Sequence, residues 1–453
     1  MAQARGGGAP SPFTTPKSRS SMRATLILIL LLISWPLPLL AQGSSTDRTI
    51  QLYQRMLHRN PNDARIYYRL GDAYIQKARE IGDPTYFTLA EESLKKCLTL
   101  APAYGGAARH LAFVLYSKHA FEEAAVQATK AIELDPKDSH AYGILGDAYL
   151  ETGKYEQARQ AYQKMMKIRQ DLHSYSRLAG LKSLRGDPKG AIEDLKQAIR
   201  EGKANGRPNE SIAWAQWQLG SEQFALGHLK EAEAQYLEAM KTYPNYYRGL
   251  AGLAQVRAAQ KRYEEAIDFY RRAIAIIPLP DSAGALGDVY MKVGRPEEAK
   301  KQYDLVEYIG YLNTLNKVLY NRELAYFYAD HDMKLSESLE LAKKELEVRK
   351  DIYAYDILAW TLFKNERFQE ARAAMAEALK LGTKDARLFY HAGMIYHHLG
   401  EAQQAQQYLQ RALSTNPHFH IFHADVAQRT LTALRGNSSP TVAFGEADKP
   451  DGR

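Results

Sequence analysis

Alanine residues recur along this 453-residue chain at a nearly constant separation. Each is followed, four places on, by another apolar or aromatic residue: Ala124, Ala158, Ala191, Ala232, Ala266, Ala299, Ala342, Ala371 and Ala405. The separation from Ala124 to Ala158 is 34 residues, and it recurs further along the chain. A period of roughly 20 to 50 residues is typical of chains that stack one small structural unit many times. The chain is therefore predicted to form an array rather than unrelated globular domains.

The clearest unit covers residues 139–170. It has an aromatic residue, a Leu-Gly pair and a tyrosine at fixed spacing, followed later by an alanine and another aromatic residue: Tyr142, Leu145, Gly146, Tyr149, Ala158 and Tyr162. Small side chains such as Gly146 and Ala158 allow two helices to approach closely. Proline cannot continue a helix, so it marks the end of the second helix in several units. These prolines are Pro102, Pro136, Pro244, Pro278 and Pro417.

This pattern resembles the tetratricopeptide-repeat family, and the chain is similar to an exported bacterial member of it. The resemblance implies an all-α, right-handed superhelical solenoid of about ten helix-turn-helix units over residues 44–434, with the first helices on the concave face. The period is irregular near residues 75–89, 201–213 and 307–350; we expect a longer turn in the first of these ranges and a loop in the second. Residues 418–434 are predicted to form a capping helix, and residues 435–453 a disordered tail.

Residues 1–43 have the composition of a secretory signal peptide. Four basic residues and no acidic residue precede or flank an apolar run that ends near Ala41. We expect export to the bacterial periplasm or the extracellular space. The alternative is an uncleaved leader that anchors the protein in the inner membrane. The only cysteine is Cys97, so the chain holds no internal disulfide, and Cys97 is predicted to be a buried small side chain.

Charge and motifs argue against two functional classes. The formal net charge is +8, but four of the basic residues lie in residues 1–41, and the remaining lysines and arginines alternate with acidic residues. Nucleic-acid binding is therefore not expected. The chain lacks the motifs of nucleophile elbows, zinc proteases and phosphate-binding loops, so we expect neither catalysis nor a cofactor.

The concave positions of the late units are rich in aromatic residues. Trp360 and Phe363, for example, lie on a different helix face from the small packing residues around them. Aromatic side chains flanked by Arg and Asp are typical of recognition surfaces. The predicted partner-binding residues are Trp217, Phe224, Arg322, Tyr326, Asp356, Trp360, Phe363, Tyr390, His391, Met394 and His397. The alternative, which stays open, is that Trp360 and Phe363 pack inside the array.

Six histidines lie between residues 391 and 423. We expect them to be exposed or to cap helices, and we predict no metal site. A site built from His397 with His418 and His420 stays open as an alternative, should the last helix fold back.

These observations predict a non-catalytic scaffold of the cell envelope that binds another protein, as an extended peptide or a helix, in its concave groove. The alternative is a regulatory subunit of an envelope enzyme complex that binds a glycan or a small molecule through the same aromatic surface. The sequence leaves the partner and the oligomeric state open.

Overall fold

The computed structural model describes residues 45–315 and 321–436, and these residues form helices and short connections without strands. The predicted signal peptide and nearly all of the predicted tail lie outside the described residues. The chain divides into two compact units after Arg48, and the array described below belongs to residues 49–436. In the part of the chain that is described, no helix has the length and apolar character needed to span a membrane.

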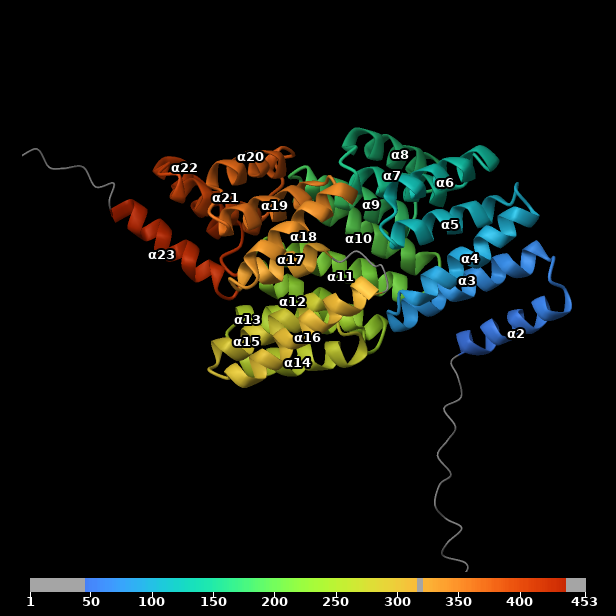
Figure 1. The fold of residues 1–453 in the computed structure, drawn as a ribbon, viewed down its shortest axis with the longest axis horizontal. Helices are drawn as coiled ribbons and strands as arrows, with labels where there is room; N and C mark the ends of the chain where they lie inside the picture. The colour runs from blue at the N-terminus through green and yellow to red at the C-terminus, as the bar shows by residue number, and fades with distance from the viewer. Residues whose placement is uncertain (1–44, 316–320, 437–453) are drawn as a thin grey trace, which may run out of the picture. The chain divides into compact units, whose positions relative to one another are not determined.

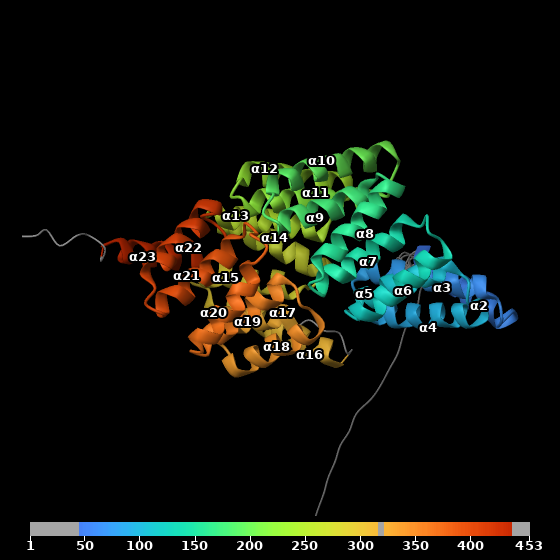
Figure 2. The same ribbon diagram turned by 90° about the horizontal axis from the view of Figure 1, so that it is seen from above.

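Ten antiparallel helix pairs make up the described array, and neighbouring pairs stack in chain order (Figure 1, Figure 2). The first helices are α3 (Ala64–Ile81), α5 (Gly105–Ser117), α7 (Ser139–Glu151), α9 (Leu172–Leu184), α11 (Asn209–Ala225), α13 (Tyr247–Ala259), α15 (Pro280–Lys292), α17 (Asn321–Asp330), α19 (Ile352–Lys364) and α21 (Ala386–His398). The second helices are α4 (Thr85–Leu100), α6 (Phe121–Leu134), α8 (Tyr155–Ile168), α10 (Pro188–Ala204), α12 (Leu229–Thr242), α14 (Tyr263–Ile276), α16 (Pro296–Leu315), α18 (Leu335–Val348), α20 (Phe368–Leu379) and α22 (Ala402–Thr415). Helix α2 (Ser45–Arg59) precedes the pairs and α23 (His423–Gly436) follows them. The predicted all-α array of about ten units is confirmed.

The prolines, glycines and cysteine singled out in the sequence occupy the structural positions predicted for them. Each proline that was predicted to end a second helix stands two residues beyond the end of one. A side chain on Gly146 would collide with the ring of Tyr162, and one on Gly220 would lie 2.6 Å from the ring of Tyr236. The absence of a side chain at these positions therefore sets the distance between the two helices of a pair. Cys97 is fully buried, as predicted.

Two predicted loops are instead helical. Between Tyr74 and Ala90 the extra residues lengthen α3 to 18 residues, and only residues 82–84 remain outside a helix. Around residues 201–213 the extra residues lengthen α10 and α11, which leaves a connection of residues 205–208. Longer helices keep the additional backbone groups hydrogen-bonded, which a longer loop would leave to solvent.

Late units of the array also contact early ones, and two such contacts are one unit apart. The amide of Lys350, just before α19, donates to the carbonyl of Glu151 at the end of α7, at 2.8 Å. One unit further along, Thr383 before α21 hydrogen-bonds the carbonyl of Leu184 at the end of α9. Leu150, Tyr155 and Leu184 belong to the same hydrophobic cluster as the apolar residues of α19 and α21. Units about 200 residues apart in sequence therefore share one core.

Gly153 and Gly186 make these contacts possible. Both have a left-handed backbone, with φ of 72° and 74°, which glycine adopts without strain. A side chain on Gly153 would strike the carbonyl of Lys350, and one on Gly186 would strike the carbonyl of Gly382. Each glycine therefore meets two requirements at once, a backbone conformation and a close backbone contact.

Candidate functional site: an inner face covered by a segment of the same chain

Most of the predicted partner-binding residues on α17, α19 and α21 are buried. Trp360 is 1% exposed, and Asp356 and His391 are not exposed at all. The other buried members of the predicted set are Tyr326, Phe363, Tyr390 and Met394. The prediction that these seven residues form an accessible surface is therefore wrong. The physical reason is that they pack on one another and are covered by the chain that follows α22.

Trp360 lies at the centre of this packing. Its ring stacks on His391 at a centroid distance of 4.1 Å and on Phe363 at 5.0 Å. Its indole nitrogen donates a hydrogen bond of 2.7 Å to Oδ1 of Asp330, at the end of α17. A buried indole needs such a partner, because an unpaired N–H inside a protein costs free energy. The face of α19 that carries Trp360 thus contacts α17 and α21 rather than solvent.

Asp356, on the same helix as Trp360, links α19 to α17 and α21. Its carboxylate accepts hydrogen bonds from the hydroxyl of Tyr326 at 2.6 Å and from Nδ1 of His391 at 2.9 Å. Burial by itself raises the pKa of Asp356, but His391, nearby Arg387 and these hydrogen bonds outweigh burial and lower it. The ionised carboxylate is therefore part of the fold, and its oxygens already have partners.

Arg322 is also engaged within the protein. Its guanidinium pairs with Asp351 at 2.8 Å and with Glu345 at 3.2 Å. His397, by contrast, is half-buried at the end of α21. Trp217 and Phe224 on α11 are half-buried too, and the guanidinium of Arg248 lies 4.8 Å from the centre of the Trp217 ring. The predicted residues therefore separate into seven buried residues and four half-buried ones, Trp217, Phe224, Arg322 and His397.

Residues 416–422, which we name the docked segment, are the part of the chain that covers the inner face. They are non-helical and connect α22 to α23. The sequence-based prediction of a helix from residue 418 is wrong here, because α23 begins only at His423. Here the backbone amides of Phe422 and His423 donate to Nδ1 of the His420 ring, at 3.2 and 3.3 Å, rather than to backbone carbonyls of a preceding helical turn.

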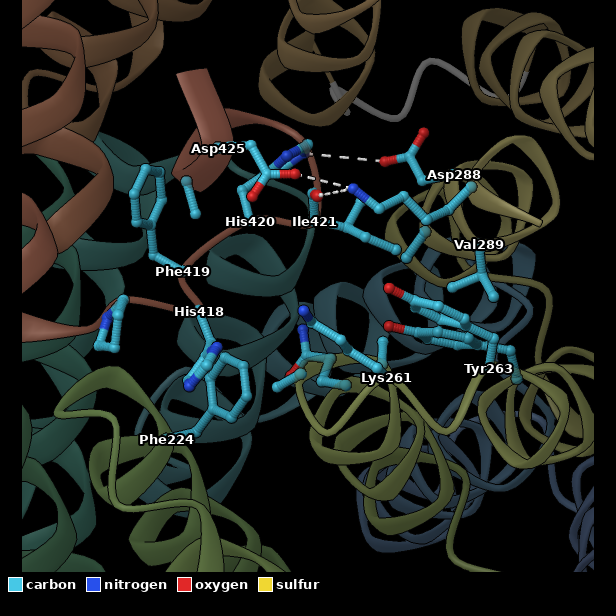
Figure 3. A pocket seen from close by; sticks show the side chains of 18 residues that line it. Phe224, Lys261, Tyr263, Asp288, Val289, His418, Phe419, His420, Ile421 and Asp425 are labelled. Atoms are coloured by element: carbon cyan, nitrogen blue, oxygen red, sulfur yellow. Dashed lines mark hydrogen bonds and ion pairs between the residues drawn. The ribbon is translucent and has the colours of Figure 1, made fainter. Parts of the chain in front are cut away.

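The docked segment is held by the first helices of much earlier units. The side-chain amide of Asn416, which is 1% exposed, donates to the carbonyl of Phe224 on α11 at 2.8 Å. The ammonium group of Lys292 on α15 donates to the carbonyl of Ile421 at 3.3 Å and pairs with Asp425 at 2.8 Å (Figure 3). The acceptors of two of these hydrogen bonds are backbone carbonyls, that of Phe224 on α11 and that of Ile421 on the docked segment. Hydrogen bonds to the main chain of a bound segment are typical of peptide recognition.

Apolar contacts complete the docking. The ring of Phe419 lies 5.4 Å from that of Tyr390, and Ile421 packs against the hydrophobic cluster of α14 and α15. The segment thus bridges the late helices and the earlier ones.

A cavity of about 260 Å³ remains beside the docked segment. Figure 3 shows Phe224 beside His418 on one side of it and Tyr263 on the other, with Lys261 between them; Ile421 of the docked segment also lines it. Aromatic rings lie beside two lysines and two carboxylates in the lining, so the cavity can hold both apolar and polar groups. The sequence singled out Phe224, His418 and His420 as candidate site residues but not the other lining residues, because the lining comes from three helix pairs, the docked segment and α23.

A cluster of histidines and carboxylates lies next to this cavity. Nε2 of His331 lies 2.7 Å from Oδ1 of Asp288, and its Nδ1 lies 2.7 Å from the carbonyl of Phe327. Burial lowers the pKa of His331, but its contact with Asp288 outweighs burial and raises it. Burial lowers the pKa of His420 and that of His423, whose rings stack at 4.1 Å. The cluster therefore favours a charged His331 beside two neutral imidazoles.

Three donor groups in this cluster converge. One nitrogen each of His420 and His423 and a carboxylate oxygen of Asp330 lie within 4.8 Å of one another. From the sequence we expected no metal site and left open one built from His397, His418 and His420. Of these three, only His420 belongs to the converging group found among the described residues. Asp330 was missed because it precedes the two histidines by about 90 residues, and only the docking of the segment brings them together.

Comparisons with known proteins agree with this fold. Two tetratricopeptide-repeat family models match the chain, one at residues 115–185 and the other at residues 217–279 and 358–418. BBSome complex member BBS4 from Bos taurus is 24% identical over 332 residues, which are 70% of this chain and 59% of that protein. Protein O-mannosyl-transferase TMTC3 from Homo sapiens is 24% identical over 200 residues, which are 40% of this chain and 21% of that protein.

The chain thus covers less than two thirds of the length of each of these two relatives. The crystal structure of yeast Tom70 aligns with 87% of this chain and 94% of its own, at 13% identity and a TM-score of 0.37. Repeats of this kind bind other proteins or peptides. From its repeat motifs, its stacked helix pairs and the matched models, the chain belongs to the tetratricopeptide-repeat family.

Proposed function

We propose that this protein is a non-catalytic scaffold that binds an extended peptide of a partner protein on the inner face of α11, α13 and α15. The observation that carries the proposal is the docked segment itself. It is a non-helical stretch whose carbonyl at Ile421 accepts from Lys292, and whose Asn416 reaches the backbone of α11. A surface that holds one extended peptide in this way has the contacts needed to hold another.

The docked segment would compete with an external partner. A tethered segment is present at an effective concentration of roughly millimolar, so a partner peptide binds only the fraction of molecules in which the segment has left. The tighter the docked segment binds this face, the weaker is the apparent affinity of the face for a partner peptide. Arg248 over Trp217 and the cavity beside Phe224 are the parts of this face that the segment leaves accessible.

The test uses a labelled peptide with the sequence of residues 416–425 and measures its binding to the full chain by fluorescence anisotropy. A released variant with Phe419→Ser and Ile421→Ser should bind it about tenfold more tightly than the unmodified chain, because the competing segment is weakened. Adding Lys292→Ala to the released variant should remove the gain, whereas Lys301→Ala, a change of an exposed lysine on α16, should not.

Two results would oppose the proposal. A released variant that keeps its helical circular dichroism but does not bind the peptide would contradict a peptide-binding face. Binding of oligosaccharides or small molecules by that variant, with no response to peptide, would instead support the alternative of a glycan- or small-molecule-binding subunit, for which the cavity of about 260 Å³ provides room.

We also propose that the scaffold works in the cell envelope after export. The support is the basic and then apolar composition of residues 1–43. Sequencing the N-terminus of the protein from an envelope fraction would identify cleavage near Ala41 or an intact anchor, and recovery only from the cytosol would refute export.

A further inference from the structure

We propose that Asp330, His420 and His423 form a binding site for a divalent transition-metal ion such as Zn²⁺. Their donor atoms lie within 4.8 Å of one another. Asp330 ends α17, whereas the histidines come from the docked segment and the first residue of α23. An ion bound here would stabilise the docked position of the segment against α17. The inference does not depend on whether the inner face also binds a partner peptide.

His423 provides the second observation that points to a ligand. The residue is 7% exposed, and its Nδ1 is buried without a hydrogen-bond partner. A buried polar atom without a partner costs roughly 1–3 kcal/mol, so such atoms are rare in folded proteins. A ring nitrogen of His423 is one of the three converging donor atoms, so an ion would give this buried imidazole a partner.

Asp330 is already oriented by its neighbour. Trp360 donates to its Oδ1 at 2.7 Å, which fixes the carboxylate and leaves its other oxygen for an ion. Hydrogen bonds of this kind from outside the ligand set commonly hold metal ligands in place. Trp360 would thus be a positioning residue for the site as well as a part of the core.

The protonation state also suits an ion. Metal ligation requires neutral imidazoles. Burial lowers the pKa of both His420 and His423 and outweighs Asp288 and Asp330, which act in the opposite direction on His420. Two imidazoles and one carboxylate match the ligand preference of Zn²⁺ and related ions, whereas Ca²⁺ and Mg²⁺ prefer oxygen ligands. Three protein ligands leave a further position for water.

Ion binding would change the start of α23. Nδ1 of His420 now accepts from the amides of Phe422 and His423. If the ion bound Nδ1, it would replace these amides, and if it bound Nε2, the imidazole proton would move to Nδ1. Both routes break two long hydrogen bonds, so we expect moderate affinity and faster amide exchange at Phe422 and His423 when the ion is bound.

The experiment titrates the full chain, purified without an affinity tag and treated with a chelator, with Zn²⁺ in an isothermal calorimeter at pH 7.5. We expect one site with a Kd in the micromolar range or tighter. Asp330→Asn and His423→Ala should each weaken that site at least tenfold. His418→Ala, from the same segment but outside the converging group, should leave it unchanged.

A second measurement keeps the proposal testable if His423→Ala loses structure. Asp330→Asn preserves the size of the side chain and its acceptor for Trp360, so it should stay folded and still lose the site. Co²⁺ bound to the unmodified chain should show the visible absorption bands of four-coordinate nitrogen and oxygen ligation. Equal Zn²⁺ binding by the unmodified chain and Asp330→Asn, or Co²⁺ without such bands, would overturn the proposal.

Discussion

The indole nitrogen of Trp360 lies 2.7 Å from Oδ1 of Asp330 and donates a hydrogen bond to it, so that α19 is joined to the end of α17. This bond joins the core of the late units to the histidine cluster. Trp360 fills the core, and Asp330 lies beside His420 of the docked segment and His423 of α23. A change at either residue should therefore affect packing and docking together.

The first prediction concerns the core role of Trp360. Trp360→Ala should destabilise the late units by about 3–5 kcal/mol, because it removes a fully buried ring and the partner of Asp330. Since stability in repeat arrays is roughly a sum of neighbour contributions, hydrogen exchange should accelerate in α17–α23 more than in α3–α6. Tyr308→Ala on α16, where the ring is 57% exposed, is the control and should change stability by less than about 0.5 kcal/mol. Unchanged exchange in α19 of the Trp360 variant would contradict its position in the core.

The second prediction separates backbone strain from close contact where late units meet early ones. Gly153→Ala should cost about 1–3 kcal/mol more than Gly294→Ala in urea unfolding followed by circular dichroism. Both glycines have left-handed backbones, with φ of 72° and 76°, so the strain is matched. Only at Gly153 would the new side chain strike a backbone carbonyl, that of Lys350, while nothing lies within 4 Å at Gly294. Equal costs for the two variants would mean that the close contact with Lys350 does not form in solution.

The third prediction tests how the docked segment is held. Asn416→Ala should weaken docking by about 0.5–1.5 kcal/mol, because it removes one hydrogen bond to the carbonyl of Phe224, which keeps the amide of Gly227 as a donor, and the one that Asn416 accepts from the amide of His418. Limited proteolysis should then cut within residues 416–422 several times faster than in the unmodified chain. Ser414→Ala changes an exposed residue at the end of α22 and is the matched control. A cleavage rate that stays the same in both variants would show that this hydrogen bond does not limit release.

The fourth prediction follows from the neutral histidines. The folded pKa values of His420 and His423 lie below the ordinary value of about 6.5. The unfolded chain therefore binds protons first as the pH falls, so the stability that these two residues contribute is complete above about pH 6.5 and declines below it. The melting temperature should fall between pH 7.5 and pH 5, and it should fall less in His423→Gln.

Neighbouring charges set the size of this effect. The groups that face the two histidines are Asp288, Asp330, His331, Lys364, Arg387 and His391. The two carboxylates partly favour a charged His420, while the basic groups oppose charging. His331 works in the other direction, because its raised pKa contributes stability below about pH 6.5 that is lost as the pH rises through its folded pKa. An identical pH dependence for the unmodified chain and His423→Gln would show that His423 is not a titrating group of the fold.

Much of the fold could be predicted because its signals are local. The 34-residue period, the small residue at Gly146 and the proline at Pro417 each act within one unit or at its border, and the structure confirms what they indicated. The lengths of α3 and α10 could not be predicted in the same way. Extra residues can extend a helix or a turn, and the choice depends on whether neighbouring units offer packing for another turn of helix.

The sequence by itself determined the all-α repeat architecture, the approximate number of units and the burial of Cys97, since these depend on spacing within a unit. Only the tertiary structure decided which faces are accessible. Trp360 and Tyr390 stand at positions that line an open surface in a bare array, yet Trp360 is covered by His391 and His423, and Tyr390 by Phe419 and His423. The approach of Asp330 to His420 was likewise decided by contacts between distant units. A pattern read along the chain carries no information on which distant units meet, because that depends on small rotations summed over many repeats.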